Sequence, residues 1–184
     1  MATYFIEEDP RPVKLFFEDE ARFGRINTIG NCWVPKGFRA IVSQQLIREY
    51  IYAYTCVCPE TGENYSIISP VNNTEAMNVF LTLVGEAYWH YRIILCLDGA
   101  GWHTSLHVKL PENIQLLALP PYSPELNPTE HIWDYLREQK KFNNHTFASL
   151  DDVEKRLSKS LKKLNSEQEI LKSMCQFPWI INPS

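Results

Sequence analysis

The sequence is short of the features that mark membrane, secreted and repeat proteins. No uninterrupted apolar run is long enough to cross a bilayer, and no charged segment followed by an apolar one opens the chain. Internal repeats and low-complexity tracts are absent as well. We therefore expect a protein that works without a membrane and is located in the cytoplasm.

Paired cysteine motifs are also lacking. The five cysteines (Cys32, Cys56, Cys58, Cys96 and Cys175) show no C-x-x-C spacing, which argues against a zinc site. Cys56 and Cys58 alternate within a strand-like run, so both would face the same side of a sheet. The cysteines are interpreted as reduced, mostly buried thiols, with an adventitious metal or redox pair as the alternative.

An excess of positive charge, which would let a protein bind nucleic acid by bulk electrostatics, is missing too. The net charge is −4 at pH 7. Residues 1–130 carry 9 Lys and Arg against 15 Asp and Glu, whereas residues 131–184 carry 9 against 7. The acidic excess lies in the first part, where it is compatible with phosphate groups only if cations neutralise it.

What the chain does contain is ordinary for a soluble globular protein. Its 184 residues are 45% apolar and 22% charged. This length and composition predict one compact domain with a sizeable core and a small helical extension.

Hydrophobic periodicity predicts an α/β protein. Apolar and alternating runs predict strands at 13–20, 50–58, 65–69, 93–97 and 114–119, with short strands and turns near 30–37. Helical spacing predicts a helix after an N-cap at Asn73, a short helix near His103 or Thr104, and helices at 128–141, 149–164 and 166–174. The last two begin with capping-box-like pairs, Ser149 with Asp152 and Ser166 with Glu169. This order is typical of a mixed sheet flanked by helices, preceded by a lead-in or linker at 1–12.

Three acidic residues stand where α/β sheets usually form a binding crevice. Asp19 and Asp98 each follow an apolar strand, and Glu130 lies in the first turn of the helix after the last strand. A buried Trp133, three residues later on the same helix face, would turn Glu130 toward the body of the protein. Converging carboxylates repel each other unless cations bind, and oxygen ligands favour Mg²⁺ or Mn²⁺.

Each of these acidic residues also has a purely structural interpretation. An Asp at a strand end often forms a turn or caps a helix. Asn127, Pro128 and Glu130 have the composition of a capping box, with Asn at the N-cap and Glu three residues later. Position and spacing alone leave metal binding and structural roles open.

Three blocks of sequence carry a family resemblance. Residues 17–23 (FEDEARF) and 30–37 (GNCWVPKG) resemble the opening of the DDE domain in mariner-like transposases, in particular their bacterial insertion-sequence relatives. Residues 97–99 (LDG), followed by His103, resemble the second block, and residues 119–133 (LPPYSPELNPTEHIW) resemble the third. The blocks occur in family order across residues 13–141.

The resemblance implies a ribonuclease-H-like catalytic domain at 13–145 and a C-terminal helical extension at 146–184 packed on it. It places the catalytic and metal-binding triad on Asp19, Asp98 and Glu130. The implied activity is DNA cleavage at transposon ends with two Mg²⁺ or Mn²⁺ ions, followed by attack of the freed 3′-OH on target DNA. The sequence departs from the family at Gly99, where many relatives have Asn, and its interval from Asp98 to Glu130 is slightly short.

Several other residues are candidates for supporting roles. His103 is interpreted as a contact to the scissile phosphate or a metal-bound water, or as a helix cap, and Asn127 as support for the site. Arg22, Arg25, Lys36 and Arg39 follow Asp19 closely and are either DNA backbone contacts or solvated loop charges. Trp33 and Trp102 either stack on unpaired bases or pack in the core or in turns.

The partners expected by resemblance are transposon-end and target DNA and a second copy of the chain, which would place it at the nucleoid when bound to DNA. A helix-turn-helix pair is not visible ahead of Val13, so we expect the recognition domain outside this chain. Two alternative functions stay open: a ribonuclease-H-like nuclease that cuts without joining, and a catalytically silent DNA-binding or assembly module derived from a transposase.

Overall fold

A single mixed sheet organises the protein. The computed structural model describes residues 9–98, 107–139 and 142–181. Its strands are β1 (Val13–Ile26), β2 (Leu46–Val57), β3 (Asn64–Ser69), β4 (Arg92–Leu97) and β5 (Ile114–Ala118). They lie in the order β3-β2-β1-β4-β5. β1 pairs antiparallel with β2, and β2 with β3, whereas β4 runs parallel to both β1 and β5.

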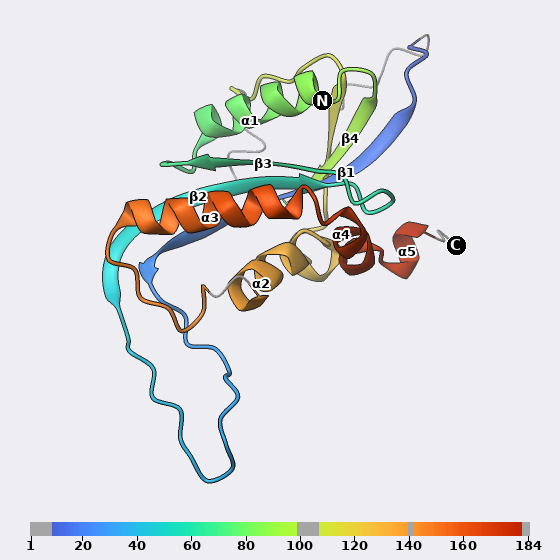
Figure 1. Ribbon diagram of the computed structural model, residues 1–184. Helices are drawn as coiled ribbons and strands as arrows, with labels where there is room; N and C mark the ends of the chain where they lie inside the picture. Colours follow the sequence, from blue (N-terminus) through green and yellow to red (C-terminus); the bar gives the residue numbers. More distant parts are fainter. Residues whose placement is uncertain (1–8, 99–106, 140–141, 182–184) are drawn as a thin grey trace.

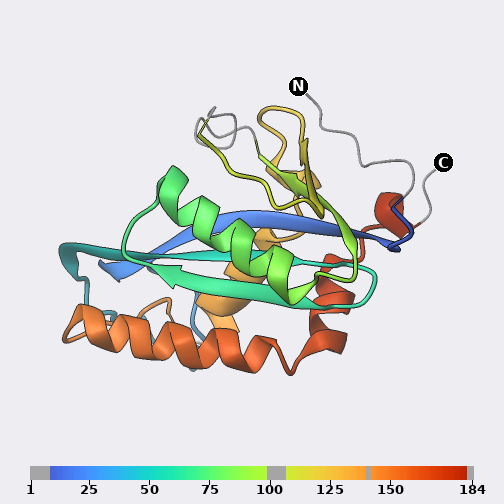
Figure 2. The same cartoon turned by 90° about the horizontal axis from the view of Figure 1, so that it is seen from above.

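Helices cover both faces of this sheet. α1 lies on one face, while α2 and α3 lie on the other, with α4 beside α2 (Figures 1 and 2). The helices are α1 (Thr74–Ala87), α2 (Glu130–Gln139), α3 (Leu150–Leu164), α4 (Gln168–Cys175) and α5 (Pro178–Ile181), with a 3₁₀ turn at Pro124–Leu126. The predicted α/β architecture of a mixed sheet flanked by helices is confirmed.

The two faces of β1 contribute to two separate cores. Phe16 packs toward α1, in a cluster with Phe80 and Leu95. Ala21 and Phe23 pack on the other face with residues of α2 and α3, among them Trp133. Successive strand residues point to opposite faces, so a single strand supplies both layers. Burial of a large apolar side chain stabilises the fold by about 1.5–3 kcal/mol, and both layers therefore hold β1 in place.

Local capping signals set the starts of α1 and α3. Asn73 Oδ1 accepts a hydrogen bond of 2.9 Å from Ala76 N, and the Ser149 side chain accepts one from Asp152 N. Both predicted N-caps are confirmed. The capping box predicted at Ser166 is wrong, because its hydroxyl donates back to the Lys163 carbonyl at 2.7 Å and α4 begins after it.

β1 is longer than the sequence predicted, and this lengthening reshapes the segment after it. The strand continues to Ile26, which pairs with Leu46 at the far end of β2. Residues 27–45 form a long projecting loop (Figure 1), without the short strands predicted near 30–37. Asn27 closes the base of this loop by donating to Ser43 O and accepting from Gln45 N, both at 2.7 Å.

The cysteines behave as unpaired thiols of the fold. All five are free, and Cys32 alone is exposed. Cys56 and Cys58 lie on the same face of the sheet, in the core beneath α1, as their alternation predicted. Within the described residues, no helix combines the length and apolar character needed to span a bilayer.

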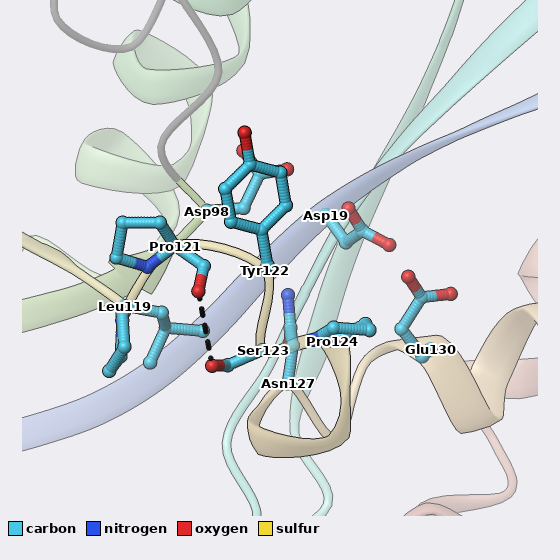
Figure 3. A pocket seen from close by; sticks show the side chains of 10 residues that line it. Asp19, Asp98, Leu119, Pro121, Tyr122, Ser123, Pro124, Asn127 and Glu130 are labelled. Carbon is cyan, nitrogen blue, oxygen red and sulfur yellow. Dashed lines mark hydrogen bonds between the residues drawn. The ribbon is translucent and has the colours of Figure 1, made fainter.

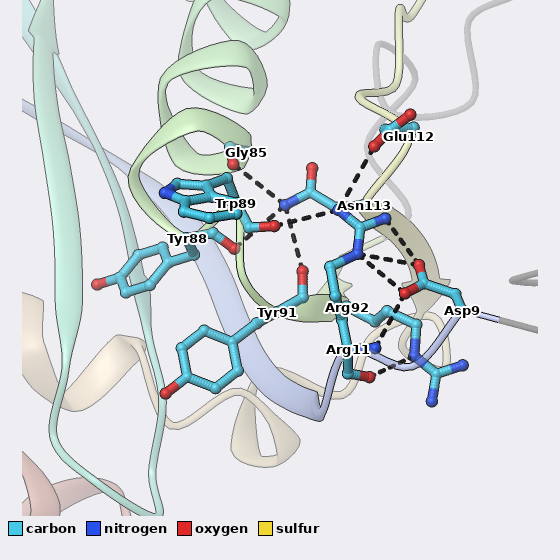
Figure 4. A network of polar contacts seen from close by, with 9 residues as sticks. All are labelled: Asp9, Arg11, Gly85, Tyr88, Trp89, Tyr91, Arg92, Glu112 and Asn113. Carbon is cyan, nitrogen blue, oxygen red and sulfur yellow. Dashed lines mark hydrogen bonds and ion pairs between the residues drawn. The ribbon is translucent and has the colours of Figure 1, made fainter.

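The end of the sheet where β4 and β5 begin is closed by a polar network (Figure 4). The Asn113 amide nitrogen donates to the carbonyls of Gly85, Tyr88 and Tyr91 at 3.1, 3.3 and 3.3 Å. These bonds satisfy carbonyls at and beyond the end of α1 and join them to the start of β5. The polar groups at this end of the sheet therefore have a structural role, whereas the opposite end carries the acidic residues.

A candidate carboxylate active site

The register of the central strands places Asp19 and Asp98 side by side. The last parallel pair of β1 and β4 is Phe17 with Cys96. Asp19 and Asp98 each lie two residues further along, so they occupy equivalent positions and the same face of neighbouring strands. Asp98 follows directly after β4, as predicted. Asp19 lies inside β1 rather than at its end, at the level where the pairing with β4 stops.

Glu130 completes a cavity at this edge of the sheet. It is the first residue of α2. The cavity has a volume of about 420 Å³ and is lined by Asp19, Asp98, Leu119, Pro120, Pro121, Tyr122, Ser123, Pro124, Asn127 and Glu130. In Figure 3 the carboxylates of Asp19 and Glu130 point toward one another. Three acidic side chains from separate parts of the chain therefore share one cavity.

Side chains of the segment that carries Glu130 bind three consecutive residues of β1. Thr129 Oγ1 donates to Phe17 O at 2.9 Å, and Asn127 Nδ2 donates to Glu18 O at 2.8 Å. Trp133 Nε1 donates to Asp19 Oδ2 at 2.7 Å. These three bonds, which we call the β1 clasp, hold the start of α2 against the strand that carries Asp19.

The capping box predicted around Glu130 does not form. Asn127 N donates to Pro124 O rather than to the Glu130 carboxylate, and Asn127 Oδ1 accepts from Thr129 N at 3.1 Å. The buried Asn127 side chain thus caps the turn that leads into α2 and also links that turn to β1. Since the Glu130 carboxylate is not used as a cap, it lines the cavity instead.

Burial and neighbouring negative charges raise the pKa values of Asp19, Glu130 and Glu18. Burial, followed by repulsion from Glu130, raises the pKa of Asp19 to about 7, although the hydrogen bond from Trp133 opposes this change. Burial also raises the pKa of Glu130, and the positive charge of Arg137 counteracts it. Glu18, buried on the opposite face of β1, has its pKa raised by burial and then by Glu20 and Asp19. A cation would relieve this repulsion.

The donor set fits a hard divalent cation, although the three carboxylates do not yet form a coordination shell. Carboxylate oxygens are the ligands that Mg²⁺ and Mn²⁺ prefer. Among the residues that the structure describes, no three His, Cys, Asp or Glu side chains lie close enough to hold one ion. Like charges without a cation favour separation, so closer approach of Asp19, Asp98 and Glu130 would accompany metal binding.

Comparison with known families decides the family of the chain. Residues 14–154 match the DDE superfamily endonucleases. The chain belongs to that family. The match contains Asp19, Asp98 and Glu130, so all three acidic residues that line the cavity lie inside the family region.

Individual relatives of this DDE-family chain include two curated proteins. It is 38% identical over 105 residues to the uncharacterized protein y4pE/y4sA of Sinorhizobium fredii, covering 56% of this chain and 77% of that protein. It is 28% identical over 145 residues to the transposable element Tc1 transposase of Caenorhabditis elegans, covering 68% of this chain and 51% of that protein.

Solved structures show the fold of the DDE-family chain. The crystal structure of a pre-cleavage Mos1 transpososome is similar with a TM-score of 0.61 and 17% identity, covering 89% of this chain and 56% of that one. The crystal structure of the Mos1 mariner paired end complex with Mn is similar with a TM-score of 0.60 and 18% identity, and the coverage of both chains is the same. The predicted ribonuclease-H-like fold is confirmed. The chain spans about half the length of the Tc1 and Mos1 proteins.

The basic residues predicted to contact DNA are carried away from the cavity. β1 continues seven residues beyond Asp19, a span of about 23 Å at roughly 3.3 Å per residue. Arg25 donates to Phe147 O and forms an ion pair with Glu49 at 2.8 Å, so the fold uses its guanidinium. Arg22 lies over the Tyr50 ring at 4.4 Å. Lys36 and Arg39 are exposed on the 27–45 loop.

The aromatic residues considered for base stacking are placed differently from expectation. Trp33 is 103% exposed on the 27–45 loop, so its predicted packing in the core is wrong. Trp102 and His103, with the short helix predicted there, lie outside the described residues. Sequence reasoning missed Tyr122, an exposed aromatic residue in the wall of the carboxylate cavity. The sequence signal that could have identified Tyr122 was its position between Pro120-Pro121 and Ser123-Pro124.

Proposed function

We propose that this chain is the catalytic part of a cut-and-paste DNA transposase. In this proposal it cuts DNA strands at transposon ends and joins the freed 3′-OH to target DNA. Membership of the DDE superfamily endonucleases and similarity to a transposase support the proposal. The observation that carries it is that Asp19, Asp98 and Glu130, far apart in sequence, line one cavity.

The metal chemistry of the proposal depends on these three carboxylates. Asp19, Asp98 and Glu130 would hold two Mg²⁺ or Mn²⁺ ions, in keeping with a Mos1 complex solved with Mn. Such ions, when bound, activate an attacking oxygen and stabilise a leaving oxygen in phosphodiester displacement. The first attacking oxygen belongs to water and the second to the 3′-OH of the cut strand.

The protein's own residues prepare the site for that chemistry. Trp133 donates to Oδ2 of Asp19 and so orients the carboxylate, which lines the cavity. Asn127 and Thr129 hold the start of α2 on β1, which fixes the base of Glu130 relative to Asp19. Because Asp19 has a pKa of about 7, it releases its proton at neutral pH when a cation competes for its oxygens.

The partners in this proposal are DNA and a second copy of the chain. Arg22, Lys36 and Arg39 offer exposed positive charge for the DNA backbone. Recognition of the transposon ends is assigned to a separate helix-turn-helix domain. Because such a chain acts on chromosomal DNA, this proposal locates it in the cytoplasm, at the nucleoid.

Two coupled assays test the proposal. The first follows nicking of supercoiled plasmid in Mn²⁺ by the wild-type chain, by Asp98→Asn and by Glu130→Gln. Both substitutions should abolish nicking, since each removes a proposed metal ligand. Glu125→Gln is the matched control, because Glu125 is an exposed acid on the same segment that does not line the cavity. It should nick as the wild type does.

The second assay supplies an oligonucleotide that ends in the 3′-OH of the element's own terminal sequence, with plasmid as target. Joined product that depends on Asp98 and Glu130 is the expected result. Nicking without joining would replace the transposase with a nuclease of the same fold. If the chain neither nicks DNA nor binds Mn²⁺ at millimolar ion, it is a catalytically silent module instead.

A further inference from the structure

Tyr122 presents its ring to solvent at the entrance of the carboxylate cavity. Its side chain is 101% exposed, although it lines the same cavity as Asp19 and Glu130. In Figure 3 the ring is seen in front of the Asp98 side chain, with Asp19 beside it. A ring that is fully exposed contributes little to folding, so its position beside the acidic residues calls for a function in binding.

The backbone holds this ring in an unusual and rigid way. Tyr122 has φ 58, in the left-handed region that residues with a side chain rarely adopt. Pro121 precedes it, and Pro124 follows two residues later, so the chain on both sides has few conformations. Ser123 Oγ donates to Pro121 O at 3.3 Å across the residue. A ring presented on such a segment loses little conformational entropy when a ligand binds.

The chemistry around Tyr122 selects the kind of ligand. The cavity floor is acidic, so it attracts the phosphate of a substrate only through bound cations. The uncharged ring face can bind a flat nucleobase beside that phosphate by stacking. A base inside a duplex has both faces covered, so the ligand must be an unpaired base. A protein seated on the ring would instead cover the cavity and block access to Asp19.

We propose that Tyr122 is a stacking platform for an unpaired base next to the scissile phosphate. It thereby positions the DNA strand over Asp19, Asp98 and Glu130. This inference rests on the proposed function and adds a substrate-positioning residue to it.

The test uses variants chosen to leave the fold intact. Tyr122→Gly removes the ring, and φ 58 suits glycine, so folding should not suffer. Tyr122→Phe keeps the stacking ring. Trp89→Ala is the matched control, since Trp89 is 66% exposed near the polar network at the opposite end of the sheet.

The readout is the fluorescence of 2-aminopurine in a short single-stranded oligonucleotide, titrated with each protein in Ca²⁺. The wild type, Tyr122→Phe and Trp89→Ala should quench the fluorescence by stacking. Tyr122→Gly should lose the quenching and bind about ten-fold more weakly. A fully duplex oligonucleotide should bind the wild type and Tyr122→Gly equally.

Three results would overturn the inference. One is unchanged quenching and affinity in Tyr122→Gly. Another is equal weakening for single-stranded and duplex DNA, which would indicate a general contact. The third is a dimer that Tyr122→Gly dissociates without any effect on quenching, which would make the ring a protein contact. Plasmid nicking by the wild type, measured on the same preparation, reports separately on the proposed function.

Discussion

Trp133 and Asp19, 114 residues apart in sequence, are joined by a hydrogen bond of 2.7 Å from the indole nitrogen to a carboxylate oxygen. Trp133 is 1% exposed and packs edge-on to Phe23, with ring centroids 6.1 Å apart. The indole is therefore fixed by the core beneath α2, and it transmits that rigidity to Asp19. Packing in the core therefore fixes the orientation of a proposed metal ligand.

Replacing Trp133 by Phe should weaken metal binding. Phe keeps an aromatic ring in the core but cannot donate a hydrogen bond to Asp19 Oδ2. Loss of such a partner behind a metal ligand typically lowers metal affinity by about 10- to 100-fold. Calorimetric titration with Mn²⁺ at pH 8 measures the change.

The control for that experiment is Leu157→Ala, which removes a fully buried side chain of α3 from the same core. It should lower stability by about 2–5 kcal/mol and leave the Mn²⁺ affinity of the folded protein unchanged. Equal loss of affinity in both variants would mean that Trp133 acts only through packing.

Replacing Thr129 by Val should destabilise the fold through the β1 clasp. Valine has nearly the same shape, but it leaves Phe17 O without the hydroxyl donor that now lies at 2.9 Å. An unsatisfied buried carbonyl costs about 1–3 kcal/mol, which lowers the thermal midpoint by several degrees. Scanning calorimetry of the metal-free chain would reveal this loss.

Thr82→Val supplies the same chemical change at an exposed site of α1, where the hydroxyl donates to Asn78 O at 2.8 Å. Its effect should stay within about 0.5 kcal/mol. If the two substitutions destabilise the chain equally, the clasp has no special part in holding α2 on β1.

The sequence predicted those parts of the fold that depend on short-range signals. Asn73 and Ser149 were recognisable as N-caps because each accepts a hydrogen bond from a residue three positions later. The true end of β1 was hidden by the cluster of Glu18, Asp19 and Glu20. Charged residues usually indicate a strand end, yet Glu18 is fully buried and pairs with Cys56 in mid-strand.

The metal-free chain should lose stability as the pH rises, and bound metal should offset that loss. Asp19 has its pKa raised from 3.8 to about 7 in the folded chain, so the folded state binds this proton more tightly than the unfolded state. Its contribution to stability is therefore fully present below about pH 4 and is lost as the pH rises through 7. The metal-free chain should lose up to about 4 kcal/mol across that window.

Thermal unfolding in EDTA between pH 4.5 and 8 measures this loss, and Asp19→Asn should reduce it. Mn²⁺ should raise the thermal midpoint more at pH 8 than at pH 5, because the proton and the metal compete for Asp19. A midpoint in EDTA that rises steadily from pH 5 to pH 8 in the wild type would contradict the burial of this carboxylate.

A glycine at the β2–β3 turn should be indispensable to the packing of α4. Gly62 has φ +76, and a Cβ there would lie 2.0 Å from the carbonyl oxygen of Gln168, the first residue of α4. Gly62→Ala should therefore destabilise the chain by more than the roughly 1–2 kcal/mol of left-handed strain alone.

Gly37→Ala is its counterpart, since Gly37 has φ +94 but open space around a Cβ. Gly37→Ala should therefore lower the free energy of unfolding only by the roughly 1–2 kcal/mol of left-handed strain. Urea denaturation compares the two variants, and a Gly37→Ala variant less stable than Gly62→Ala would refute the close approach of α4.

The members of the candidate site could be proposed from the sequence, but its geometry could not. Asp19, Asp98 and Glu130 were chosen from expected strand ends and a helix start together with the resemblance of three sequence blocks, and Asp19 lies within β1 rather than at its end. Thr129 and Trp133 could not be assigned their partners, because these lie 112 and 114 residues away. Such contacts depend on how α2 packs against β1, and hydrophobic periodicity carries no information on that arrangement.

The central claim is that Asp19, Asp98 and Glu130 bind divalent ions together. Crystals of the chain soaked in millimolar Mn²⁺ and measured at the manganese absorption edge locate the ions directly. We predict anomalous peaks in the cavity, within about 2.5 Å of oxygens from all three side chains and absent in Asp98→Asn. Peaks elsewhere, or an ion held with any one of the three turned away, would contradict the account.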